Sequence, residues 1–433
     1  MKQFEQTRRI VTALGALFLV LIITGCGQES TPAAGTKAEK VKLLWLTGRD
    51  ETQSALLRST IQSFEAKHPN IEVELQEISG NYYQKVTVML AGGTPPDILW
   101  MGQAFGEFAA RGAFLDLTSR IAADIDISEF YPEVLNWYTV NGKQYGIPHG
   151  IDMQMIIYNK KAFEEAGLAQ PKDDWTIEAF VAAAQKLTLD RDGDGRTDQY
   201  GFSGRLPHCI WGAHFVSKDG TKALCDTPQM AAWARFHLDM VHKWKVSPSS
   251  EKFKSEGLEG VSAFRQGRAA MMECATFLLP QYREKCADME WDIVASPTVG
   301  DNERAHWASS SAFLATANTP HPDEAWLFIQ HLISDNLQMA FSGQSLPSKK
   351  RVARKFVEEN TLKPPNIKCL IDSVDYLHPF PRVANLNELE SHFNDSVDRI
   401  FVSYGSKKPV APEAAFKEAA RRMDATIAKR MRR

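Results

Sequence analysis

The alternation of strand and helix patterns near the start of the chain limits its fold more than any other feature. Val41–Leu46 is an almost continuous apolar run, typical of a buried strand, and Gln53–His68 places its apolar residues on one helical face. Ile71–Leu75 alternates strictly between apolar and acidic residues, which predicts a second strand. A helix over Tyr82–Leu90 and a strand over Asp97–Trp100 continue the order. Strands that alternate in this way with helices form mainly parallel sheets covered by helices, so the run predicts an α/β fold.

Later segments repeat the same theme. We expect a strand at Met155–Tyr158 and helices at Ile177–Leu187, Met230–Lys243, Pro322–Ser334 and Pro412–Met431. The chain has 433 residues, which is more than one hydrophobic core usually covers, so two lobes are expected.

The N-terminus has the organisation of a bacterial export signal. Three basic residues precede the apolar stretch Ile10–Ile23, which is shorter than the roughly 20 residues of a membrane span. The segment Ile23-Thr24-Gly25-Cys26 resembles a bacterial lipobox, in which the signal is removed before a cysteine that carries a diacylglycerol. The resemblance implies a signal peptide over residues 1–25, a lipid at Cys26 and a place on the extracytoplasmic side of a bacterial membrane. An ordinary secretory signal or a short membrane helix remains the alternative.

The rest of the composition is that of a soluble surface. Residues 26–40 are small and polar, as in a flexible tether. The 53 acidic and 50 basic residues are interspersed and give a formal charge of -3, so no nucleic-acid partner is expected.

Five cysteines remain after Cys26, and an extracytoplasmic location would allow them to oxidise. The interval from Cys209 to Cys225 and that from Cys274 to Cys286 could each close a short loop, and Cys369 is left over. Sequence does not determine the pairing, so one disulfide and buried free thiols both stay open. No cysteine or histidine spacing indicates zinc.

Several short motifs occur in the order found in one family of proteins. They are Trp45-Leu46-Thr47-Gly48-Arg49-Asp50, Ala91–Ile98, Gly112–Leu117, Tyr145-Gly146-Ile147-Pro148, Ile157-Tyr158-Asn159-Lys160, Phe163–Leu168, Trp175 with Phe180, Phe264–Met271, Ala325–Ile329 and Ser345-Leu346-Pro347. This series resembles the extracellular solute-binding proteins of bacterial ABC sugar importers, the maltodextrin-binding-protein-like group, from Val41 to the C-terminus. The resemblance implies two α/β lobes, each with a mainly parallel sheet, joined by crossing strands and closing on a ligand by a hinge.

The crossings are expected near Pro148–Met153, residues 298–306 and Leu346–Val352. The corresponding lobes are residues 41–149 with 303–346, and residues 150–302 with 347–433. Gly150 tolerates the backbone change that hinging needs, whereas His149 is interpreted first as a structural residue.

A neutral sugar offers hydroxyl groups, which carboxylates and amides bind, and apolar C–H faces, on which aromatic rings stack. Position by position, the resemblance implies ligand-binding roles for Arg49, Asp50, Trp100, Gln103, Asp152, His208, Trp211 and Phe277. Trp307 is added because it follows a predicted crossing. The charges of Arg49 and Asp50 are reversed relative to the family pattern, the spacing to Gln103 is one residue shorter, and Phe277 stands in place of a tryptophan. Packing in the core remains the alternative for the aromatic residues.

A run of acidic residues and glycines follows the helix expected at Ile177–Leu187. Oxygen donors fall at the odd positions of a calcium-loop pattern, with Gly195 at the sharp turn, namely from Asp190, Asp192, Asp194, the carbonyl group of Arg196 and Asp198. The final position is Gly201 instead of glutamate, which excludes a complete EF-hand. A structural Ca²⁺ ion and a turn that bonds only to itself both stay open, and no other cofactor is expected.

The combined interpretation is a substrate-binding lipoprotein of an ABC-type carbohydrate importer. It would act as a monomer that captures a mono- or oligosaccharide and delivers it to permease subunits in the membrane. The motifs of common hydrolases, P-loop proteins and dinucleotide enzymes are absent from the sequence, so no enzymatic activity is expected. The alternatives are a glycerol-phosphate-type polyol as ligand, for which Arg49 and Arg205 are the cationic candidates, a non-transporting glycan-binding adaptor, and a secreted glycoside hydrolase.

Overall fold

The computed structural model describes residues 40–48, 53–379, 381, 383, 385–404 and 406–431. Residues Lys40–Arg433 form one compact unit, which is the unit described here. The signal peptide, Cys26 and nearly all of the tether lie outside the described residues, as do Arg49 and Asp50. Within the described part, no helix combines the length and the apolar character needed to cross a membrane.

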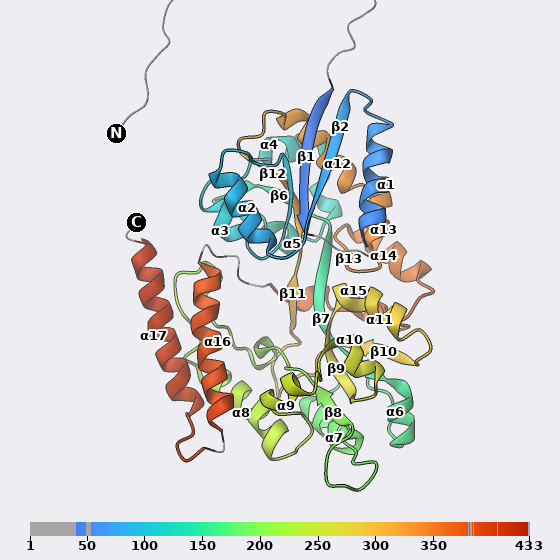
Figure 1. Ribbon diagram of the computed structural model, residues 1–433, viewed down its shortest axis with the longest axis vertical. Helices are drawn as coiled ribbons and strands as arrows, with labels where there is room; N and C mark the ends of the chain where they lie inside the picture. Colours follow the sequence, from blue (N-terminus) through green and yellow to red (C-terminus); the bar gives the residue numbers. More distant parts are fainter. Residues whose placement is uncertain are drawn as a thin grey trace, which may run out of the picture. The chain divides into compact units, whose positions relative to one another are not determined.

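The first sheet has the strand order β2-β1-β3-β12-β6 (Figure 1). Its strands are β1 Val41–Gly48, β2 Ile71–Ile78, β3 Ile98–Met101, β6 Gly146–Pro148 and β12 Ala312–Ala315. The strand β1 pairs in parallel with β2 and β3, while β12 is antiparallel to both β3 and β6. The β-α-β-α-β order expected at the start of the chain is therefore confirmed.

Helices cover both faces of this sheet. On one face Trp45 packs edge-on against Phe328, with ring centroids 5.2 Å apart, and Phe64 packs on Phe328 at 4.8 Å. On the other face Leu46 and Leu99 belong to a second apolar cluster. The helices on this side of the molecule are α1 Ser54–Glu65, α2 Tyr82–Ala91, α3 Phe105–Ala109, α4 Thr118–Asp124, α5 Pro132–Asn136, α12 Pro322–Leu332 and α13 Asp335–Phe341.

The second sheet has the order β14-β11-β7-β9-β8, with β10 and β13 also paired to β7. Its strands are β7 Gly150–Asn159, β8 Tyr200–Ser203, β9 Ala269–Ala275, β10 Trp291–Val294, β11 His306–Ser309, β13 Leu346–Pro347 and β14 Leu377–Pro379. All pairs made by β7 are antiparallel, while β8 pairs in parallel with β9 and β11 with β14. The α/β class with two sheets is confirmed. This second sheet, however, is mixed and not mainly parallel, because every strand that pairs with its central strand β7 runs antiparallel to it.

Helices also surround the second sheet, and several begin at clear capping residues. The Thr176 hydroxyl accepts a hydrogen bond from the Ala179 N–H at 3.3 Å, and Thr227 precedes Pro228 in the same role. The helices here are α6 Lys160–Glu165, α7 Ile177–Leu187, α8 Pro228–His242, α9 Ser250–Ser255, α10 Gly260–Arg265, α11 Leu279–Lys285, α14 Lys350–Glu359, α15 Lys368–Asp372, α16 Leu386–Ser403 and α17 Pro412–Met431. Short 3-10 turns are Ile127–Glu129, His208–Trp211, Thr276–Leu278 and Val374–Tyr376, and a small hairpin is formed by β4 Thr139–Val140 and β5 Lys143–Gln144.

The chain passes between the two sheets at three places. The first is Pro148–Gly150, where β6 ends and β7 begins, and the third is at β13, both near their expected positions. The second lies between Ser309 and Ala312 and not at residues 298–306, because His306–Ser309 is already strand β11 of the second sheet. The exact lobe boundaries stay a prediction.

The five described cysteines are buried free thiols. Each of the two loops that a disulfide could have closed is therefore open in the structure. The cysteines are Cys209, Cys225, Cys274, Cys286 and Cys369.

Candidate ligand-binding site

A cavity of ≈ 170 Å³ lies where the two sheets meet. Gln103, which follows β3, lines it from the side of the first sheet. The second sheet contributes the rest, from the start of β7, the end of β9 and the strand β11, and these residues are Asp152, Met153, Gln154, Ala275, Phe277, Trp307, Ala308 and Ser309. Both β3 and β9 meet the cavity with their carboxyl ends, the usual position of ligands in α/β sheets.

Asp152 supplies a carboxylate to this cavity. One of its oxygens accepts a hydrogen bond from the Ser345 hydroxyl group, and Thr276 also bonds to the carboxylate. Burial raises the pKa of Asp152 to about 6, and these two hydrogen bonds partly offset the rise. The group is therefore ionised at neutral pH and can accept hydrogen bonds from ligand hydroxyl groups.

Amide groups stand on both sides of the cavity. The Gln103 side chain is exposed, and Gln154 is half-buried on the same face of β7 as Asp152. The Gln154 amide donates a hydrogen bond to Glu273 on the neighbouring strand β9. An amide that is oriented in this way presents fixed polar groups to a ligand.

Two aromatic side chains supply apolar surface. Phe277 is 52% exposed although it is a large apolar residue, and Trp307 is half-buried. Behind Trp307 the ring of His208 lies 5.4 Å away, between centroids. An exposed phenyl ring beside a supported indole ring suits the C–H faces of a sugar.

Four of the nine expected ligand residues line this cavity: Gln103, Asp152, Phe277 and Trp307. Their ligand roles stay predictions. Sequence reasoning missed Gln154, although the two-residue period of a strand would have placed it on the same face as Asp152.

The other expected residues that the structure describes, Trp100, His208 and Trp211, do not line this cavity. Trp100 is half-buried on β3, where its ring contacts His149 at 4.8 Å and Phe313 at 5.6 Å, so it packs beside the first crossing. His208 is buried and supports Trp307, while Trp211 is buried against Phe236 at 5.0 Å.

Arg205, one of the two cationic candidates for a phosphorylated ligand, does not line the cavity, and the other, Arg49, lies outside the described residues. Among the described residues, no arginine or lysine does so.

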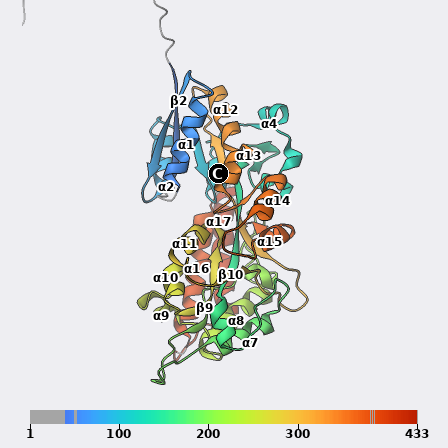
Figure 2. The same ribbon diagram turned by 90° about the vertical axis from the view of Figure 1, so that its right-hand side faces the viewer.

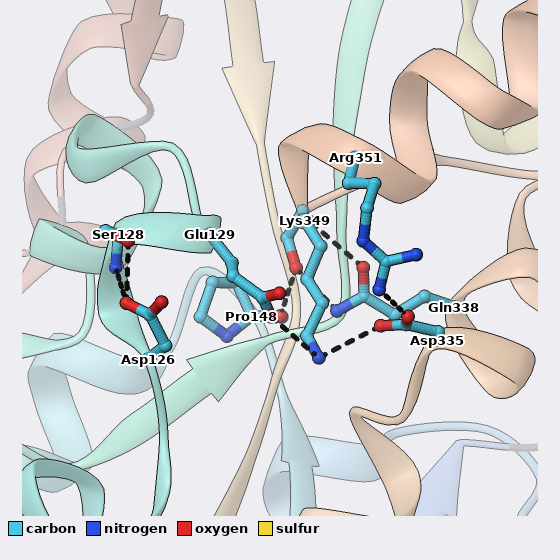
Figure 3. Close-up of polar contacts among 9 residues, drawn as sticks. Asp126, Ser128, Glu129, Pro148, Asp335, Gln338, Lys349 and Arg351 are labelled. Atoms are coloured by element: carbon cyan, nitrogen blue, oxygen red, sulfur yellow. Dashed lines mark hydrogen bonds and ion pairs between the residues drawn. The ribbon is translucent and has the colours of Figure 1, made fainter.

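The crossings beside the cavity are held by polar contacts (Figure 3). The buried Gln338 amide of α13 donates to the Ser348 hydroxyl group at 3.0 Å, and its oxygen accepts the Lys349 N–H at 3.0 Å. Ser348 in turn donates to the carbonyl oxygen of Pro148 at 2.6 Å. The first and third crossings are thus joined to each other and to α13.

Charged groups surround the same point. The Lys349 ammonium group lies 3.4 Å from Glu129 and 3.1 Å from Asp335, and Arg351 also pairs with Asp335. Figure 2 shows α13, α14 and α15 following one another along this side. His149 lies within the first crossing, and burial lowers its pKa to about 4, so it is neutral there.

The acidic loop after α7 brings three carboxylates together. One oxygen each from Asp190, Asp192 and Asp194 lies within 4.8 Å of the others, and all three side chains are exposed. Two oxygen ligands that each lie roughly 2.4 Å from one Ca²⁺ ion are at most about 4.8 Å from each other. The type of donor and the spacing of these three carboxylates therefore fit calcium. The carboxylates also accept backbone N–H groups, as from Gly195 to Asp190 at 2.9 Å. Asp198 instead accepts the Arg191 N–H at 2.6 Å.

Comparison with known proteins decides the family. Residues 59–365 match the family model of the bacterial extracellular solute-binding proteins. The chain belongs to this family. The expected resemblance is therefore confirmed, and membership places the protein outside the cytoplasm.

Individual relatives are distant but cover most of the chain. A binding protein of Brucella abortus is 23% identical over 85% of this chain and 89% of its own length. The diacetylchitobiose-binding protein of Streptomyces coelicolor is 28% identical over 79% of this chain and 82% of its own. An ABC substrate-binding protein of Listeria monocytogenes, solved in complex with cycloalternan, superposes with a TM-score of 0.77 at 22% identity, over 90% of this chain and 100% of that one.

Proposed function

We propose that this solute-binding protein captures a neutral mono- or oligosaccharide in the cavity between the two sheets and presents it to an ABC permease. The observation that carries this proposal is the combination of exposed Phe277, half-buried Trp307 and the Asp152 carboxylate around one cavity. Carbohydrates need both an apolar surface for stacking and acceptors for hydroxyl groups. The relatives named for diacetylchitobiose and solved with cycloalternan support the same ligand class.

The lining of the cavity is compatible with closure by a hinge. Gln103 approaches from the first sheet and the remaining lining from the second, so a ligand that touches both stabilises the closed arrangement selectively. The protein itself then performs no chemistry, and ATP is hydrolysed by another subunit of the importer. We also propose that the protein is a monomer held at the membrane by a lipid on Cys26, and that the loop at residues 190–198 holds a structural Ca²⁺ ion.

A ligand screen tests the proposal. Residues 27–433 include the whole compact unit, and we expect one or more carbohydrates of a neutral panel to raise its melting temperature. Phe277→Ala should weaken binding of that carbohydrate roughly fivefold to thirtyfold, because the stacking surface is lost. Tyr404→Ala removes a comparably exposed aromatic residue outside the cavity and should leave affinity unchanged. Equal affinity of the Phe277 variant and the wild type would contradict the assignment of this cavity.

A further inference from the structure

A second cavity, of ≈ 320 Å³, lies beside the second sheet. Its lining residues come from α8, α9, α16 and the ends of β8 and β9. Its apolar wall includes Met240, Phe253 and Phe401, and none of its lining residues lines the cavity between the sheets. The volume is that of a small-molecule site, typically about 300 Å³ or more.

Arg205 supplies the fixed positive charge of this cavity. Its guanidinium carbon lies 4.7 Å from the centre of the Phe401 ring and 5.9 Å from that of Trp233. Stacking occupies the face of a guanidinium group and leaves its N–H edges able to donate. Within the described part of the chain, these edges donate no hydrogen bond and form no ion pair within 4.0 Å, and the nearby carboxylates of Glu273 and Asp398 act on the guanidinium group only through longer-range attraction.

The backbone holds Arg205 in place. Its N–H donates to Glu273 at 2.9 Å, and the other carboxylate oxygen of Glu273 accepts from Gln154. Gly204 has φ +131°, and a Cβ atom there would lie 2.7 Å from the Cβ atom of Glu273. Only glycine allows this close approach, so the position of Arg205 is built into the fold.

The remaining charges select the type of anion. Glu273 and Asp398 both line the cavity, and they would repel a doubly charged phosphate more strongly than a singly charged group. Lys254, exposed on α9, adds one further positive charge. A carboxylate carries a single charge and matches the planar guanidinium edge with two parallel hydrogen bonds.

We propose that this cavity binds a small monocarboxylate with an aromatic or apolar body, whose carboxylate pairs with Arg205 and whose body lies against Phe253 and Phe401. The site is separate from the carbohydrate cavity and does not depend on the identity of the sugar.

Benzoate is the probe, and benzamide is its uncharged match. Titration of residues 27–433, followed by ligand-detected NMR, should give a dissociation constant for benzoate on the order of 1 mM and no saturable binding of benzamide. Arg205→Gln should weaken benzoate binding roughly tenfold or more, and Arg205→Lys should recover only part of it. Arg235→Gln, on the exposed face of α8, removes the same charge outside the cavity and should leave benzoate binding unchanged.

The position of the site is tested with a variant of the other cavity. Phe277→Ala should leave benzoate binding as it is, because Phe277 does not line the second cavity. Equal binding of benzoate and benzamide by the wild type, or no saturable binding of benzoate, would overturn the proposal even if the Arg205 variants failed to fold. A loss in the Phe277 variant equal to that in Arg205→Gln would place benzoate in the carbohydrate cavity and would also overturn it.

Discussion

Replacing Asp152 by asparagine should change both the affinity for carbohydrate and the way stability depends on pH. Burial raises the pKa of this group from 3.8 to about 6, so the folded protein holds a proton there in a range where the unfolded chain has lost it. The folded state is therefore destabilised as pH rises through this window. At pH 7 the raised pKa lowers the free energy of unfolding by roughly 3 kcal/mol, relative to a carboxyl group whose pKa is the same in the folded and unfolded states.

Ligand affinity should respond in the opposite direction. Sugar hydroxyl groups bond best to the ionised carboxylate, and with a pKa of about 6 only about one Asp152 group in eleven is ionised at pH 5. Carbohydrate affinity of the wild type should thus fall roughly tenfold between pH 7 and pH 5. Asp152→Asn should bind roughly 10- to 150-fold more weakly at pH 7, the range for hydrogen bonds to a charged group, and should show little pH dependence.

Calorimetric titrations with the carbohydrate at several pH values measure the affinity, and denaturant unfolding of the two proteins measures the stability. The stability of the wild type relative to Asp152→Asn should rise as pH falls from 7 to 4. Asp372→Asn is the control, since Asp372 is an exposed residue paired with Lys368. If the asparagine variant keeps wild-type affinity at pH 7, or if wild-type affinity is flat between pH 7 and pH 5, the role assigned to Asp152 fails.

Four further outcomes are expected. Trp100→Ala should reduce the free energy of unfolding by roughly 3 kcal/mol, measured with urea, because its ring packs beside the first crossing. An unchanged free energy of unfolding with a large loss of carbohydrate affinity would show instead that Trp100 binds the ligand. Cys26→Ala should move the protein from the membrane fraction to the soluble fraction, and persistent sedimentation in high salt would refute lipid attachment. If the loop at residues 190–198 binds calcium, EDTA should lower the melting temperature and Ca²⁺ should restore it more effectively than Mg²⁺. No change in melting temperature, together with no metal in elemental analysis, would show that the loop is a turn that binds no metal. Small-angle scattering should show a smaller radius of gyration with saturating carbohydrate, and an unchanged radius with binding confirmed would exclude closure.

Local patterns predicted the elements well where the burial of each one follows from its own sequence. Helices α7 and α17 have the expected boundaries, Ile177–Leu187 and Pro412–Met431. Helix α16, Leu386–Ser403, was not expected, although six of its residues are buried against its neighbours. Its buried apolar residues nevertheless recur every three or four positions, at 386, 389, 393, 397 and 400, so the sequence pattern alone could have predicted this helix.

The candidate site was only partly predictable, because the direction of a side chain depends on residues far away in sequence. Trp100 lies near the end of a strand, as a stacking residue would, but its ring packs against Phe313 and His149. Phe277, in contrast, remains exposed. Arg205 follows a strand that could have faced the carbohydrate cavity, and only the helices α8, α9 and α16 show that a separate cavity receives it.

The strand β7 has a consequence for anyone who wishes to alter ligand specificity, for example to build a sensor. Asp152 and Gln154 belong to the same ten residues that begin at the first crossing, and Asp152 is paired in register with Ser309 at the second. Selection for a new ligand at these positions would therefore also change how readily the protein bends. Trp307 lies on β11, which leads directly into the second crossing, whereas Phe277 follows β9 and belongs to none of the crossings. A library that varies Phe277 can therefore retune recognition while leaving the moving parts intact.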